Sequence, residues 1–179
     1  TELKIIGDVD AKDTGTIVKF SPDEQIFSAT EFSFEILSSR LRELAFLNKG
    51  VKIEIEDERT EKKNEFHYDG GIISFVEYLN KNKTPLHKTI YSSKGKNGIQ
   101  LEYALQYNDG YQENVFSFAN TINTYEGGTH LIGFKTALTR VMNNYIEKNK
   151  LKGIKLTSED TREGLTAVIS IKIPEPHFE

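Results

Sequence analysis

Two hydrophobic periodicities alternate along this chain, and they restrict its fold more than any other feature. Residues 51–56 alternate strictly between apolar and charged side chains, and residues 99–107 carry Ile, Leu or Tyr at every second position. A period of two is typical of β-strands with one buried face. Residues 34–47 and 131–145 repeat apolar side chains every three or four positions, which predicts amphipathic helices. The mixture predicts an α+β fold with helices packed on sheet faces.

Capping and stop residues give the expected ends of the helices. Thr30 is a plausible N-cap for the first helix, and Gly50 a plausible stop. A short helix is expected over 72–79, after the Asp-Gly-Gly run at 69–71, which is the best candidate for a domain boundary. Ser158 is expected to cap a last short helix.

Turn residues give the expected ends of the strands. A short strand is expected over 14–20, residues 66–68 should pair back on 51–56, and a last strand should run over 165–173. The Asn-Asp-Gly run at 108–110 is a strong hairpin signal. It predicts that strand 99–107 pairs directly with a return strand carrying Val115, Phe116 and Phe118.

Composition excludes several classes of protein. The chain has no cysteine, which excludes disulfides and thiolate metal sites and fits a reducing cytoplasm. No apolar run is long enough to span a membrane, so no membrane association is expected. The formal net charge is -4, whereas a protein that simply coats nucleic acid is usually basic. DNA binding is therefore not expected to be the sole task of this segment.

The residues alone do not assemble a self-contained active site. Neither a Walker-type phosphate loop nor a dinucleotide-binding glycine fingerprint occurs in the sequence. The four histidines lack the spacing of zinc ligands. Paired glycines at 127–128 could cradle an anion at a helix start, but a tight strand-to-helix turn explains them more simply. We therefore predict no catalytic residue and no metal site in this chain.

Several long motifs, in fixed order, resemble the DNA gyrase B family of bacterial type II topoisomerases. They are RLRELAFLNKGV at 40–51, YDGGI at 68–72, FVEYLN at 75–80, QYNDG at 106–110, EGGTHL at 126–131 and DTREGL at 160–165. The resemblance covers residues 15–179. Extended strings of this kind are far more specific than a lone glycine pattern.

The resemblance implies a fold and a set of partners. Residues 1–68 would be the C-terminal part of a GHKL-type ATPase domain, and residues 69–179 a transducer domain that resembles the second domain of a ribosomal protein. The full-length protein would use ATP and Mg²⁺, dimerise with a second copy of the B subunit when ATP binds, and act with the gyrase A subunit on double-stranded DNA. Its work would be strand passage and negative supercoiling in the cytoplasm.

The same resemblance implies that the nucleotide site is incomplete in this sequence. Thr16 and Val18 match the family's strand beside the adenine and the aminocoumarin pocket, and burial in a sheet is the alternative that the resemblance makes less favoured. The family's catalytic glutamate, magnesium-binding asparagine and glycine-rich lid have no counterpart, and its Gln-Thr-Lys loop should come just after Glu179. We therefore expect the chain alone to be inactive and to bind no cofactor tightly.

Lys135 and Arg140 are the candidate DNA contacts. They lie on the polar side of the helix over 131–145, which in the family would face the cavity that the transported duplex crosses. Solvation of both side chains is the alternative. The residues that this helix is expected to bury are Leu131, Phe134, Leu138 and Val141.

Two other functions stay open at this stage. The B-type subunit of topoisomerase IV, a decatenating enzyme, shares most of these motifs, and only the stretch 111–114 favours gyrase. A non-catalytic interaction module that shares the transducer fold is the alternative from another class.

Overall fold

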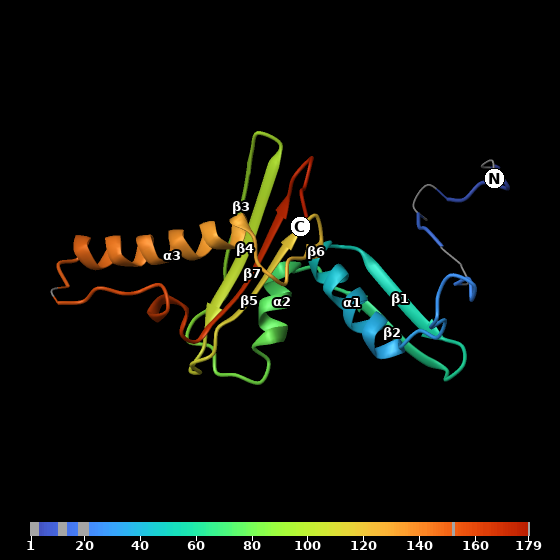
Figure 1. Cartoon of the computed structure of the whole chain (residues 1–179), viewed down its shortest axis with the longest axis horizontal. Helices are drawn as coiled ribbons and strands as arrows, with labels where there is room; N and C mark the ends of the chain where they lie inside the picture. The colour runs from blue at the N-terminus through green and yellow to red at the C-terminus, as the bar shows by residue number, and fades with distance from the viewer. Residues whose placement is uncertain (1–3, 11–13, 18–21, 152, 179) are drawn as a thin grey trace. The chain divides into compact units, whose positions relative to one another are not determined.

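The computed structural model describes residues 4–10, 14–17, 22–151 and 153–178 and divides the chain into two units, Thr1–Ser33 and Phe34–Glu179 (Figure 1). In the first unit, residues 14–17 have no regular secondary structure and are exposed. The strand predicted over 14–20 is therefore wrong for 14–17, and residues 18–20 lie outside the described residues. A strand needs a neighbour to take up its backbone hydrogen bonds, and 14–17 pair with no described strand.

The second unit begins with a helix and a hairpin. Helix α1 spans Phe34–Leu47, and β1 (Lys52–Asp57) pairs antiparallel with β2 (Lys62–His67). The burial of β1 alternates residue by residue, which confirms the predicted strand and hairpin. Gly50 follows α1 with a φ of +81°, as a helix stop should. Thr30 is not the N-cap, because α1 begins only at Phe34.

A short helix, α2 (Ile72–Leu79), joins α1 in the first of two hydrophobic cores. Phe46 on α1 is 1% exposed, and its ring stacks on Tyr68 at 3.7 Å and on Phe75 at 4.7 Å between centroids. Stacked aromatic rings add to the stabilisation from buried area alone. This core joins the two sides of the boundary predicted at 68/69, and that boundary stays a prediction.

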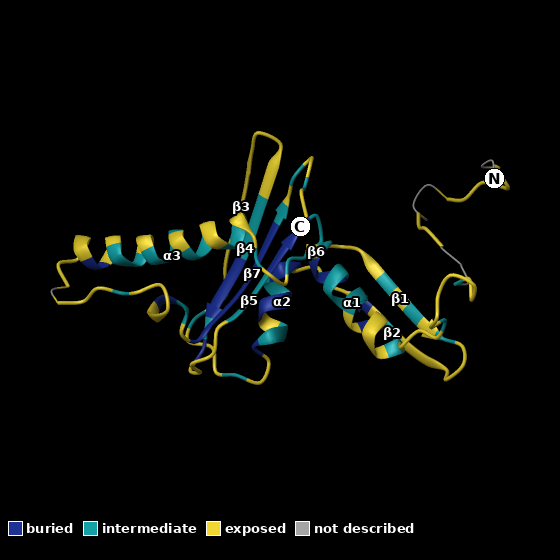
Figure 2. Cartoon of the chain, viewed as in Figure 1, coloured by how far each residue is buried: buried dark blue, intermediate teal, exposed yellow. Residues whose placement is uncertain are grey.

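Five strands form one mixed sheet in the order β3-β4-β7-β5-β6. The strands are β3 (Ile90–Lys96), β4 (Ile99–Tyr107), β5 (Asn114–Ala119), β6 (Ile122–Asn123) and β7 (Leu165–Lys172). The central strand β7 runs antiparallel to β4 and parallel to β5. Its first six residues are all buried, as expected for a strand covered on both faces (Figure 2).

The hairpin predicted at residues 108–110 is wrong. β7 lies between β4 and β5, so these two strands do not pair. Asn108 turns inward, where its backbone NH and its Nδ2 both donate to Gly164 O, at 2.9 and 2.8 Å. A tight hairpin of this sheet joins β3 to β4 at Asn97 and Gly98, both with positive φ. An Asn-Gly pair is the preferred residue choice for such a turn.

Helices cover both faces of the sheet. Helix α2 packs on the face that carries Ala104, Phe118 and Val168, and α3 (Thr129–Lys148) packs on the opposite face. These layers confirm the predicted α+β class. Among the described residues, no helix has both the length and the apolar character needed to cross a lipid bilayer.

Only the first half of α3 lies on the sheet. Leu131, Phe134 and Leu138 contact the second core, as predicted. Val141 is 61% exposed, so its predicted burial is wrong, and Tyr145 is 64% exposed. A helix of 20 residues is about 30 Å long, and the second half of α3 extends beyond the sheet (Figure 1).

Candidate functional site

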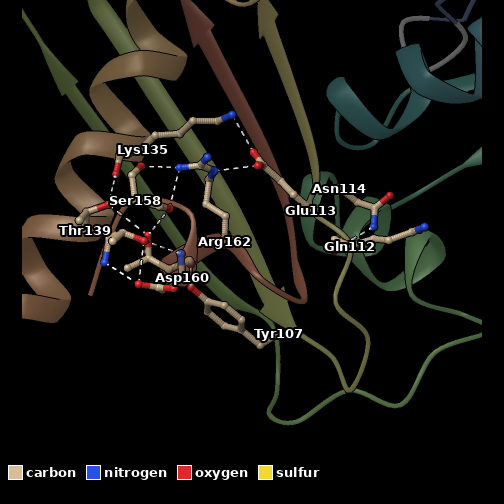
Figure 3. A network of polar contacts seen from close by, with 11 residues as sticks. Tyr107, Gln112, Glu113, Asn114, Lys135, Thr139, Ser158, Asp160 and Arg162 are labelled. Atoms are coloured by element: carbon tan, nitrogen blue, oxygen red, sulfur yellow. Dashed lines mark hydrogen bonds and ion pairs between the residues drawn. The ribbon is translucent and has the colours of Figure 1, made fainter. Parts of the chain in front are cut away.

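An ion-pair network centred on Glu113 holds the predicted DNA contact Lys135 (Figure 3). Glu113 Oε1 lies 2.7 Å from Lys135 Nζ, and its Oε2 accepts a hydrogen bond of 2.7 Å from Arg162 Nε. The Arg162 side chain is only 15% exposed, and the side chains of Lys135 and Glu113 are 30% and 31% exposed. Three segments that are distant in sequence therefore meet at one carboxylate that is partly exposed to water.

A short 3-10 helix, η1 (Asp160–Arg162), places Arg162 in this network. Thr157 and Asp160 cap it reciprocally, since Thr157 N donates to Asp160 Oδ2 at 2.7 Å and Asp160 N donates to Thr157 Oγ1 at 3.2 Å. This is the geometry of a capping box. Ser158, the predicted cap, instead accepts a hydrogen bond from Arg162 Nη1 to its carbonyl at 2.6 Å. The side-chain hydrogen bonds before η1 therefore come from Thr157 and not from Ser158, and the N-cap position itself is Glu159, which makes no side-chain cap.

Neutral hydrogen bonds tie the same segment to α3 and β4. Thr139 Oγ1 lies 3.1 Å from Thr161 Oγ1, and Tyr107 Oη donates to Thr161 O at 2.6 Å. Burial raises the pKa of Tyr107 to about 12, so its hydroxyl keeps its proton and stays a donor. The network thus anchors η1 and α3 to the sheet.

Electrostatics bind Lys135 to Glu113. Burial of Glu113 opposes its ionisation, but hydrogen bonds from Lys135 and Arg162 outweigh burial and lower the pKa of the carboxyl. The hollow beside the network has a volume of about 310 Å³. Its lining is mostly acidic and consists of Tyr111, Glu113, Glu159, Asp160, Arg162 and Glu163. A phosphate at Lys135 must therefore compete with Glu113 and meets further carboxylates nearby.

Arg140, the other predicted DNA contact, is differently placed. It is exposed, and it forms no ion pair with any described residue. Five residues separate it from Lys135, which is a rotation of about 140° around a helix with 3.6 residues per turn. The two cations therefore do not share one face of α3, and Arg140 is the more available one.

The predicted nucleotide contacts lie in the other unit. Thr16 is exposed within the irregular stretch 14–17, and Val18 lies outside the described residues. No cluster of three or more His, Cys, Asp or Glu side chains suited to a metal ion occurs within the described part of the chain. Of the two predicted nucleotide contacts, the structure therefore describes only Thr16.

Sequence reasoning missed Glu113 and Arg162 as members of this network. Arg162 stands in a run of charged residues over 159–163, a composition typical of a solvated helix start, whereas its side chain is only 15% exposed. Glu113 and Arg162 are 49 positions apart, so no local spacing could have paired them. The charge run was the only signal of an ion-pair network, and a charge run does not identify the distant partner.

Comparison with known proteins gives the family. The family model described as DNA gyrase B matches residues 71–179. The chain belongs to the DNA gyrase B family. The resemblance inferred from the motifs is thereby confirmed.

Curated gyrase B relatives match along nearly the whole sequence. The DNA gyrase B protein of Bacillus mycoides is 55% identical over 184 residues, which cover 99% of this chain and 45% of that protein. The DNA gyrase B protein of Clostridium acetobutylicum is 56% identical over 179 residues, with 97% and 28% covered. The chain thus spans less than half the length of these gyrase B proteins.

Solved structures of gyrase B share the fold. The 43K ATPase domain of Thermus thermophilus gyrase B, in complex with an aminocoumarin, has a TM-score of 0.76 and 36% identity over 88% of this chain and 44% of that one. The topoisomerase IV ATP-binding domain of Francisella tularensis has a TM-score of 0.71 and 26% identity over 88% and 43%. The fold is therefore common to gyrase and topoisomerase IV.

Proposed function

We propose that this chain is part of the ATP-operated clamp of a DNA gyrase, in which ATP binding and hydrolysis drive DNA strand passage and negative supercoiling. The observation that carries the proposal is the match of residues 71–179 to the gyrase B family, supported by about 55% identity to curated gyrase B proteins. The proposed partners are a gyrase A subunit, a second gyrase B protein and double-stranded DNA. A cytoplasmic location follows, because the chromosome lies there.

The test of this function is made with the full-length protein and its gyrase A partner. Relaxed plasmid should become negatively supercoiled only when ATP and Mg²⁺ are present. Decatenation of linked circles without supercoiling would instead support the topoisomerase IV alternative. The similarity to the topoisomerase IV ATP-binding domain of Francisella tularensis is the observation that favours this alternative. Absence of both activities in a folded, nucleotide-binding complex would favour the interaction-module alternative.

Within that function, we propose that Thr16 and Val18 line the adenine end of the nucleotide site of the full-length protein. Thr16 can exchange one hydroxyl hydrogen bond, whereas Val18 can only pack. Thr16→Ala should weaken nucleotide or aminocoumarin binding by about 1 kcal/mol, the usual contribution of one hydrogen bond. Calorimetry measures this, with Thr60→Ala in the β1–β2 loop as the control. Equal affinities of the wild type and both variants would refute the assignment.

We also propose that Lys135 and Arg140 face the transported duplex, with Arg140 the stronger contact. Each phosphate contact that is lost should flatten the salt dependence of DNA binding by roughly one unit in the log–log slope. Arg140→Ala should show this change in full. Lys135→Ala should show less, because Glu113 already holds Lys135 at 2.7 Å.

Glu113→Gln provides a matched control for the DNA contacts. It removes the carboxylate that competes with DNA for Lys135, so the salt dependence of DNA binding should become steeper in this variant. Adding Lys135→Ala should return the slope to a value near that of Lys135→Ala alone. Wild-type slopes and supercoiling rates in all variants would mean that this side of α3 is merely solvated.

A further inference from the structure

The turn between β5 and β6 is a two-residue hairpin turn that contains an unusual residue. Its two central residues, Asn120 and Thr121, have φ values of +47° and +68°. Asparagine adopts this left-handed region more readily than most residues, whereas for a β-branched residue such as threonine it is an outlier. A residue persists in such a conformation only when its surroundings hold it there.

On one side, the turn is held by α1. Arg40 Nη2 donates to Thr121 O at 2.7 Å, and Arg40 Nη1 donates to Glu43 Oε2 at 2.8 Å. Arg40 and Thr121 are 81 positions apart, and their hydrogen bond is partly buried. A hydrogen bond from a charged donor is stronger than one between neutral groups. The guanidinium therefore fixes the carbonyl of the strained residue to α1.

On the other side, the turn holds the outgoing end of β7. Asn120 N donates to Ile171 O at 2.8 Å. The side-chain amide of Asn120 then continues the ladder beyond the last strand residue, since its Nδ2 donates to Ile173 O at 2.9 Å and its Oδ1 accepts from Ile173 N at 2.8 Å. One side chain thus satisfies both backbone groups of a residue that has already left the sheet.

We propose that Asn120 and Thr121 form a positioning clamp through which α1 fixes the segment that leaves β7. The path runs from Arg40 through the Thr121 carbonyl and the Asn120 amide to Ile173. Displacement of α1 therefore moves the residues after β7 instead of being absorbed by a loose turn. The coupling role of the clamp rests on the proposed function: the clamp passes nucleotide-driven movement from the first predicted domain into the second. Arg40, Asn120 and Thr121 are positioning residues in this scheme and touch no substrate.

Hydrogen exchange of the Ile173 amide tests the clamp in this chain without reference to ATP. Asn120→Gly keeps the positive φ available but removes the amide, so exchange should speed up about tenfold. Arg40→Met should also speed exchange at Ile173, although Arg40 does not touch that residue. Glu43→Gln, which only neutralises the other partner of Arg40, should leave the rate unchanged. An unchanged rate in Arg40→Met would overturn the proposed path.

The full-length protein with its gyrase A partner tests the coupling. Asn120→Gly and Arg40→Met should lower the number of supercoils introduced per ATP hydrolysed by about tenfold while nucleotide affinity stays the same. Arg40→Lys, which still offers one donor to Thr121 O, should restore most of the ratio. Thr121→Asn, which suits the left-handed backbone and keeps the carbonyl, should behave as wild type.

The possible outcomes separate the clamp from the proposed function. An unchanged ratio of supercoils to ATP in Asn120→Gly would overturn the coupling role, as would a parallel fall in nucleotide affinity and stability, which indicates a merely structural effect. If the wild-type complex shows no ATP-dependent supercoiling, the proposed function fails, and the exchange rates at Ile173 still decide whether the clamp exists.

Discussion

Replacing Gly164 by alanine should destabilise the second unit strongly. Gly164 precedes β7 with a φ of +70°, and a Cβ there would lie 2.6 Å from Gly110 O and 2.7 Å from Asn108 O. The left-handed backbone alone costs a side chain about 1–2 kcal/mol. Both oxygens belong to the backbone, so the clash with the new Cβ is relieved only if the backbone shifts. That shift also stretches the two hydrogen bonds from Asn108 to Gly164 O, each of which contributes about 1 kcal/mol.

The total expected loss for Gly164→Ala is about 4 kcal/mol, or a fall in Tm of about 10 °C for a chain of this size. Gly153→Ala is the matched control, because Gly153 also has a positive φ, of +84°, but its added Cβ would meet nothing within 4 Å. The control should lose only about 1–2 kcal/mol. Urea unfolding followed by circular dichroism measures both. Equal losses in the two variants would refute the argument from backbone contact.

Two further predictions concern the first core and the ion-pair network. Phe46→Ala should lower the free energy of unfolding in urea by about 3–5 kcal/mol, because it empties a site that a fully buried ring fills. The control is Leu37→Ala, at a position on the same helix that is 38% exposed, and it should cost under about 1.5 kcal/mol. Similar losses in the two variants would contradict the stacked core. Hydrogen bonds from Lys135 and Arg162 keep the folded pKa of Glu113 below its usual 4.5 despite burial, so its contribution to stability is complete above that pH and is lost as pH falls through the folded pKa. Glu113→Gln should therefore lower stability by about 1 kcal/mol at pH 7 and by progressively less as the pH falls below 4.5, and a difference that does not change with pH would contradict the ion-pair account.

Local patterns were enough to predict the elements whose causes are local. The alternation of β1 and the apolar repeats of α1 and α3 depend on residues a few positions apart, and these elements lie where the spacing placed them. Strand order has no such local cause. The position of β7 between β4 and β5 depends on pairs such as Tyr103 with Ile169 and Val115 with Ala167, which periodicity does not specify.

The polar contacts were less predictable than the fold. Helical spacing predicts Lys135 to be a free cation on the outer side of a helix. Its ion-pair partner, Glu113, lies just before the first residue of β5. Helical spacing predicts which residues of a helix lie outside the core. It does not predict which carboxylate, distant in sequence, forms an ion pair with them. The motifs identified the family because they are long and ordered, a kind of information that single ion pairs lack.

The central place of β7 has a consequence for the order in which this protein can fold. Residues 165–172 are the last described strand to leave the ribosome, and both β4 and β5 need them as a neighbour. Until then the nascent chain carries two hydrophobic strands with unpaired edges, which are the usual starting points of aggregation. Pairing of Gln100 with Lys172 also joins segments far apart in sequence, which slows folding. The sheet can therefore close only after translation has passed β7, and the unpaired edges of β4 and β5 stay exposed until that moment.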